Sequence, residues 1–268
     1  MKKVLTTLAT LTALAGTAQA DFLRVEMGGG VWNQEAPDTS YFQYENSSVV
    51  STFPGYSTES KATATDNATG TEISTNYAWL FIKHPIPIIP NFRFEYSAVE
   101  SDGILSATGE LYGITADSEP APTNMKLTQM EVIPYYNILD NTFWLTLDLG
   151  LAIKAIHYDA KGGSGEVSYN ESGDLALPLL YTRARVQLPI TNLGLEGIVK
   201  YISDGGDNTI SDMSIKMDYT FDITPLVQPG LEIGYRVMTL ESDNTSGDTR
   251  TIIDYEFSGV YGGLMLRF

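Results

Sequence analysis

The sequence has no cysteine, only two histidines, and about half as many basic as acidic residues. The absence of cysteine excludes disulfides, thiol catalysis and cysteine-ligated zinc. The two histidines, His84 and His157, restrict histidine-dependent catalysis to two positions. Lysine and arginine total 16 against 33 aspartates and glutamates, and the resulting net charge of −17 argues against nucleic acid as a partner.

Long hydrophobic runs are missing after the first 20 residues. The chain starts with the basic pair Lys2-Lys3, continues with an apolar run to Ala15 and reaches a small-residue site at Ala18-Gln19-Ala20, as secretory signal peptides do. We therefore expect a cleaved signal peptide over residues 1–20 and one domain over 21–268. No later stretch approaches the ~20 apolar residues of a transmembrane helix, so a membrane location would require strands.

Alternation typical of a strand is clearest over residues 142–158. Large apolar side chains take every second position there: Phe143, Leu145, Leu147, Leu149, Leu151 and Ile153. Asp148 and Lys154 fall on the opposite face, which favours a lipid-facing exterior and a polar interior; a soluble β-sandwich would turn such an apolar face inward. The segment exceeds the ~9–11 residues that a tilted strand needs to cross a bilayer, so it should protrude.

Short and long connections alternate along the chain. Short turns are predicted near residues 85–91, 137–141, 189–194 and 224–229, and longer loops near 33–75, 100–124, 159–174, 203–211 and 241–250. This alternation is typical of the periplasmic turns and extracellular loops of outer-membrane barrels. The predicted fold is all-β: a single antiparallel up-and-down transmembrane β-barrel of about ten strands, with eight or twelve as alternatives and both termini in the periplasm.

The two ends of the mature chain carry distinctive strands. The first strand is predicted from Phe22 to Trp32, and its glycines 28–30 are interpreted as a bulge or tight bend. The last ten residues alternate apolar and mixed positions and stop on Phe268. This ending resembles the closing strand of bacterial outer-membrane barrels, which carries their assembly signal. The resemblance implies that the barrel assembly machinery and periplasmic chaperones are partners, and that the signal comprises Gly263, Leu264, Leu266 and Phe268.

Four features together resemble a family of small bacterial outer-membrane barrels that has no assigned activity and is loosely related to outer membrane protein W. They are the leader, the glycine-rich first strand ending at Trp32, the turn from His84 to Pro87 and the ending from Gly263 to Phe268. The resemblance implies export to the bacterial outer membrane and contact with its lipid and lipopolysaccharide. It brings no catalytic residue and no cofactor.

Inward-facing charges should fill the barrel. Ten residues share the parity of the predicted polar interior: Arg93, Glu95, Asp148, Lys154, Arg183, Arg185, Lys216, Asp218, Glu232 and Arg236. Side chains just fill a barrel of about eight strands, whereas water-filled porins need about sixteen. We therefore predict a narrow lumen occupied by paired charges.

Two further groups could carry chemistry. His157, with Asp159 two residues later, is predicted at the outer rim on the lipid-facing side, where a histidine and a carboxylate could activate a nucleophile or water. Two sets of carboxylates could ligate calcium: Asp204, Asp207 and Asp212, and separately Glu241, Asp243 and Asp248. Neither set completes a metal loop, so solvated acidic loops are the favoured interpretation. No metal or cofactor is therefore expected.

These observations lead to one expected function and two alternatives. The expectation is a non-enzymatic envelope protein that is structural or passes small solutes in a porin-like way. The first alternative is a rim-active outer-membrane enzyme that modifies lipid A or cleaves proteins. The second is a secreted soluble β-sandwich, against which the outward apolar run at 143–153 argues.

Overall fold

A computed structural model describes residues 23–35, 40–45, 56–57, 61–65, 73–86, 88–106, 109–111, 114–116, 121–164, 167–206, 208–224, 226–246 and 249–268. The predicted signal peptide lies outside the described residues. All regular secondary structure in the described part is β-strand. No described segment forms a helix that is long and apolar enough to span a membrane.

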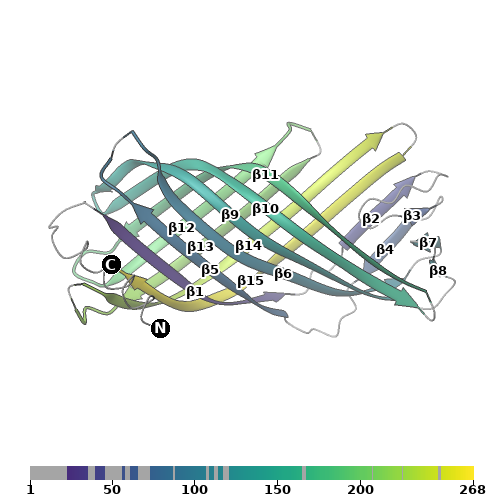
Figure 1. The fold of residues 1–268 in the computed structure, drawn as a ribbon, viewed down its shortest axis with the longest axis horizontal. Helices are drawn as coiled ribbons and strands as arrows, with labels where there is room; N and C mark the ends of the chain where they lie inside the picture. Colours follow the sequence, from purple (N-terminus) through teal and green to yellow (C-terminus); the bar gives the residue numbers. More distant parts are fainter. Residues whose placement is uncertain are drawn as a thin grey trace, which may run out of the picture.

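Ten strands form one closed antiparallel barrel, which confirms the predicted fold class and strand number (Figure 1). They are β1 (Arg24–Glu35), β5 (Ile73–Lys83), β6 (Asn91–Ser106), β9 (Ala121–Thr142), β10 (Leu145–Ser164), β11 (Val167–Gln187), β12 (Leu193–Ser203), β13 (Thr209–Thr220), β14 (Gln228–Ser246) and β15 (Thr249–Arg267). Each pairs with the next in this order, and β1 pairs with β15 to close the wall. The start of β1 and the end of β15 therefore lie at the same end of the barrel.

The barrel wall continues far past the apolar outer positions at the end opposite the start of β1 and the end of β15. There β2 (Ser40–Glu45) pairs with β15, β4 (Lys61–Thr65) pairs with β6, and β2 and β4 pair with each other. These two strands extend the wall above the ends of β1 and β5 (Figure 1). A small separate sheet is formed by β3 (Tyr56–Ser57), β7 (Gly109–Leu111) and β8 (Ile114–Ala116).

The prediction of long loops at 159–174 and 241–250 is wrong. The β10–β11 ladder continues without interruption to the pair Ser164 and Val167, and the β14–β15 ladder continues to Ser246 and Thr249. The predicted loops at 33–75 and 100–124 likewise contain β2, β3, β4, β7 and β8. Strands outside the lipid do not need an apolar outer face, so polar and glycine-rich composition does not distinguish them from loops.

The outer surface carries an apolar belt. On β10 the outward positions from Leu145 to Ala155 are apolar over 11 residues, and on β13 the outward row extends from Met213 to Phe221. Leu149, Leu151 and Ile153 are 42–49% exposed, which a water-facing surface would disfavour. The belt length matches the ~9–11 residues of a membrane-crossing strand.

The glycines of β1 do not form the predicted bulge. Gly28, Gly29 and Gly30 pair with β15 and β5 in unbroken register. A Cβ atom added at Gly28 would lie 2.6 Å from the Trp79 ring, which packs inside the barrel over this position. The glycine therefore provides space for a large lumen side chain.

Candidate functional site in the lumen and at the rim

The structure places all ten predicted lumen residues inside the barrel, each in an ion pair. Six further charged residues that the sequence analysis did not assign to the lumen lie among them: Glu26, Glu131, Glu196, Lys200, Asp212 and Arg267. The sixteen side chains comprise eight bases and eight acids, so the negative charge of the chain lies elsewhere. The lumen charges are thus balanced.

The half of this network nearer the start of β1 and the end of β15 is built around two arginines of β11. Arg183 contacts Asp148 at 2.6 Å and Glu196 at 2.7 Å. Arg185 contacts Asp218 at 2.5 Å, and Arg267 from the closing strand contacts the same carboxylate at 2.9 Å. Arg183, Asp148 and Asp218 are almost completely inaccessible to solvent, so these pairs are formed in a desolvated interior.

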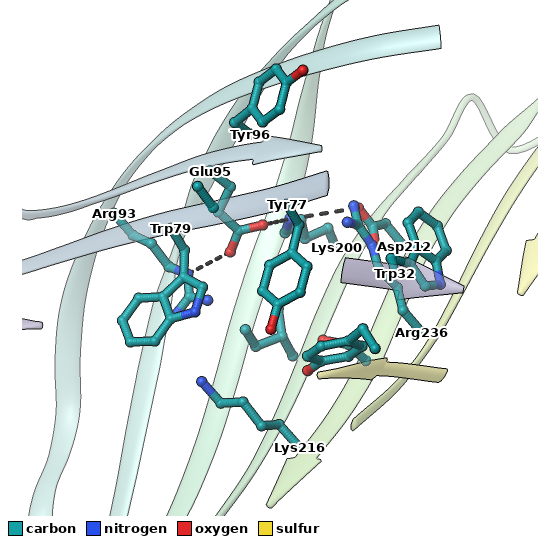
Figure 2. A pocket seen from close by; sticks show the side chains of 14 residues that line it. Trp32, Tyr77, Trp79, Arg93, Glu95, Tyr96, Lys200, Asp212, Lys216 and Arg236 are labelled. Carbon is teal, nitrogen blue, oxygen red and sulfur yellow. Dashed lines mark hydrogen bonds and ion pairs between the residues drawn. The ribbon is translucent and has the colours of Figure 1, made fainter. Parts of the chain in front are cut away.

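The other half of the network, nearer β2 and β4, is built around Asp212 and Glu131. Lys154 and Arg236 each lie 2.6 Å from Asp212, and Lys200 lies 2.8 Å from Glu131. Lys200 also lies 2.5 Å from Glu95 (Figure 2). Asp212 therefore belongs to the lumen, and its assignment to a solvated acidic loop is wrong. The reason is that β13 begins at Thr209, which puts Asp212 inside the barrel wall.

Aromatic side chains fill the space between the charges. Tyr77 donates a hydrogen bond of 2.7 Å and Trp79 one of 2.9 Å to Glu232, which also pairs with Lys216 at 3.0 Å. The ammonium of Lys216 lies 4.3 Å from the centre of the Trp79 ring, and Arg93 approaches the same ring from β6 (Figure 2). Cation–π contacts of this kind hold the rings and the charges in one arrangement.

At the end of the barrel where β1 starts and β15 ends, a cavity of about 370 Å³ is lined by Arg24, Gln187, Arg267 and Phe268, and a smaller cavity lies deeper among the charges. A cavity beside Trp32, Tyr77 and Trp79 has a volume of about 50 Å³, enough for a few water molecules. Extracellular to the charged network, Leu127, Ile156, Met238 and Phe257 lie inside the wall and are fully or almost fully buried. A charged layer and an apolar layer thus close the lumen in series.

His157 lies outside the lumen, on the outer face of β10 just above the apolar belt. It is directly opposite Asp174 on β11, and its Nδ1 lies 2.8 Å from Asp174 Oδ1. Its Nε2 lies 3.7 Å from Asp159 Oδ2. The hydrogen bond to Asp174 raises the pKa of His157, and the two nearby negative charges act in the same direction. The sequence analysis identified His157 and Asp159, but it could not identify Asp174 without the β10–β11 register.

The remaining candidates have structural contacts or lie outside the described residues. His84 accepts from Ile86 N at Nδ1 and contacts the Pro90 carbonyl at 2.9 Å through Nε2, so it braces its turn. Asp204 accepts a 2.8 Å hydrogen bond from Gly206 N. Asp207 and Asp248 are not among the described residues. In the part of the chain that is described, no His, Cys, Asp and Glu side chains gather into a metal-binding group.

Comparisons with known proteins show an outer-membrane barrel fold. The chain superposes on the outer membrane protease OmpT from Escherichia coli with a TM-score of 0.50 and 11% identity, covering 95% of this chain and 100% of that one. It is less similar to the toluene transporter TodX from P. putida, with a TM-score of 0.32 and 8% identity over 96% of this chain and 91% of that one. No family model matches the sequence, and no curated protein is significantly similar to it. The relation to outer membrane protein W stays a prediction.

The expectation of a non-enzymatic protein is corrected by this comparison. The barrel architecture of the chain is also that of a protease, so the fold includes enzymes. At 11% identity the likeness shows the fold alone. An activity must be argued from the residues of this chain.

Proposed function

We propose that the protein is a structural component of the bacterial outer membrane, with a closed barrel that holds an extended wall at the cell surface. One observation carries this proposal: eight basic and eight acidic side chains are paired across the lumen. Removing one member of such a buried pair leaves an uncompensated charge, so the network resists opening. Solute passage would require the network to separate.

The wall beyond the membrane supports the same proposal. β9, β10 and β11 have 20 to 22 residues each, about twice the length that crosses a bilayer. A barrel that served only as a pore would not need these extensions. The function therefore resides at the extracellular end, and the lumen provides stability.

We expect planar-bilayer recordings of the refolded protein to show no steady current, because the lumen is closed by a charged and an apolar layer. Brief, small openings would be compatible with local separation of ion pairs. A porin refolded by the same procedure serves as the positive control. Large, steady currents from the unmodified protein would contradict the closed-barrel proposal.

The pair of His157 and Asp174 favours a second candidate function, hydrolysis at the extracellular rim. With Nδ1 donating to Asp174, the lone pair of Nε2 is available to accept a proton from water or a hydroxyl group. Asp159, 3.7 Å from Nε2, could orient that water. The position just above the apolar belt would give access to lipid A or to surface peptides.

The pKa of His157 provides a test of this arrangement. We expect Asp174→Asn to lower the pKa of His157, because the charged hydrogen-bond partner is lost. NMR titration of the two histidines measures this, with His84 as the internal reference. A general base acts in its neutral form, so any hydrolysis should increase as the pH rises through the elevated pKa, and Asp174→Asn should move that rise to lower pH.

Activity itself is tested with His157→Ala. Lipid A profiles by mass spectrometry and cleavage of a peptide library should change in this variant if the rim is catalytic. Asp204→Ala, an exposed substitution in another extracellular loop, is the matched control. Identical profiles for His157→Ala and the native protein would rule out the second candidate and leave the structural proposal intact.

A further inference from the structure

The four turns at the end of the barrel that holds the termini expose large apolar side chains. This apolar turn ring comprises Ile88 between β5 and β6, Phe143 and Trp144 between β9 and β10, Ile190 between β11 and β12, and Ile223 between β13 and β14. Ile88 and Phe143 are 86% and 90% exposed, and Ile190 is fully exposed. Turns that face water usually carry Gly, Asn, Asp, Ser or Pro at such positions, so this composition requires an explanation.

Three residues of the ring also have an unfavourable backbone conformation. Phe143, Trp144 and Ile190 have φ angles of 52°, 67° and 67°. Positive φ is a genuine outlier for bulky and β-branched residues, whereas Asn-Gly would fit a two-residue hairpin turn without strain. The chain therefore keeps apolar side chains at turn tips where both solubility and conformation favour other residues.

The ring is continuous with the lipid-facing belt. On β10 the outward apolar row runs from Leu145 to Ala155, and Phe143 and Trp144 follow directly below Leu145. On β13 the outward row ends at Phe221 and continues into Ile223. At the other end the outer face becomes polar at once, with His157, Asp159 and Asp174.

The length of the belt positions the bilayer. Eleven residues from Leu145 to Ala155 suffice to cross the hydrocarbon region. If His157 marks the extracellular boundary, the β9–β10 turn lies at the periplasmic boundary. Two acidic side chains near the turns have partners: Asp140 pairs with Lys83 at 2.6 Å, and Asp222 accepts a hydrogen bond from Asn192 at 3.0 Å.

We infer that the apolar turn ring inserts into the phospholipid leaflet on the periplasmic side of the outer membrane. The occupant of this surface is therefore lipid, since the ring prolongs the lipid-facing belt without a polar break on β10 and β13. Trp144 is suited to this boundary because tryptophan prefers the interface between acyl chains and headgroups. Insertion sets the depth of the barrel and leaves the long strands on the extracellular side.

The distribution of tryptophans allows a direct test. The chain has three, of which Trp32 and Trp79 are inside the lumen with 1% and 7% exposure, while Trp144 is 55% exposed. We propose to reconstitute the full-length protein into phosphatidylcholine vesicles that contain lipids brominated near the carbonyl end of the acyl chains. We expect these lipids to quench part of the tryptophan fluorescence, Trp144→Phe to abolish this quenching, and aqueous iodide to have little effect.

A second turn provides an independent measurement. In the Trp144→Phe background, Ile190→Trp places a probe on the β11–β12 turn, and we expect quenching by brominated lipid to return. Quenching of Trp144 by iodide with none by brominated lipid would overturn the inference. That result would place the turns in water and make a periplasmic protein the candidate occupant.

Discussion

Replacing Arg183 and Arg185 together with alanine should destabilise the barrel strongly and open the lumen. Asp148 would lose its arginine partner, and Glu196 and Asp218 would each lose part of their positive surroundings. Breaking one buried ion pair by removing a single partner costs about 3–5 kcal/mol. In detergent, we expect the folded form, which migrates as a compact species in electrophoresis, to disappear at a lower temperature than in the native protein. We also expect larger and more frequent openings in bilayer recordings.

Lys126→Ala with Lys161→Ala is the matched control, because it removes the same charge from two exposed side chains. We expect this variant to unfold and conduct like the native protein, since exposed ion pairs contribute little. Arg183→Lys with Arg185→Lys should restore part of the stability by retaining the charge. Equal unfolding temperatures for the alanine variants in the lumen and on the surface would refute the stabilising role of the network.

Much of the fold follows from the sequence because the membrane imposes a simple rule on it. Within the bilayer, lipid requires an apolar residue at every second position, and the row from Leu145 to Ile153 shows this pattern directly. Beyond the bilayer that requirement ends. The composition around Gly162 and Asn244 therefore predicts loops, although the backbone pairing of the strands continues there.

The sequence predicts a lumen filled with paired charges, but it identifies only part of the residues that line it. Glu131, Glu196 and Lys200 occupy inward positions of strands that the sequence analysis had located, so the same alternation could have identified them. Asp212 was missed for another reason, since it follows an acidic loop and the start of β13 is not marked by composition. Pairing partners such as Asp174 for His157 depend on register, which alternation alone does not determine.

The glycine-rich first strand shows why a local rule failed. Glycine in a strand often indicates a bulge, yet the β1 ladder is regular and its inward Gly28 lies beneath the Trp79 ring. The hydroxyl of Tyr77, on β5, reaches across β1 to Gly263 on β15. The need for these glycines arises from residues far away in the chain, so it cannot be read from the glycine segment itself.

Gly28→Val should therefore prevent correct closure of the barrel. Its Cβ atom would lie 2.6 Å from the Trp79 ring, so the indole would have to leave its position. Trp79 would then lose its hydrogen bond to Glu232 and its contact with the Lys216 ammonium. The ion pair between Lys216 and Glu232 would no longer be shielded by the indole ring. Overpacking alone costs about 1–3 kcal/mol, and the disrupted network adds to that cost. We expect little or no compact, heat-modifiable form after refolding.

Gly197→Ala is the control that separates this effect from the general cost or benefit of replacing glycine. Gly197 faces outward on β12, and a Cβ atom there would meet no other atom closer than 4.0 Å. We expect Gly197→Ala to fold at least as well as the native protein, because alanine restricts the unfolded chain without a clash. Gly28→Val combined with Trp79→Ala should recover part of the folded fraction, since the smaller side chain vacates the position over β1. If Gly28→Val refolded as completely as Gly197→Ala, Trp79 would not depend on the glycine beneath it.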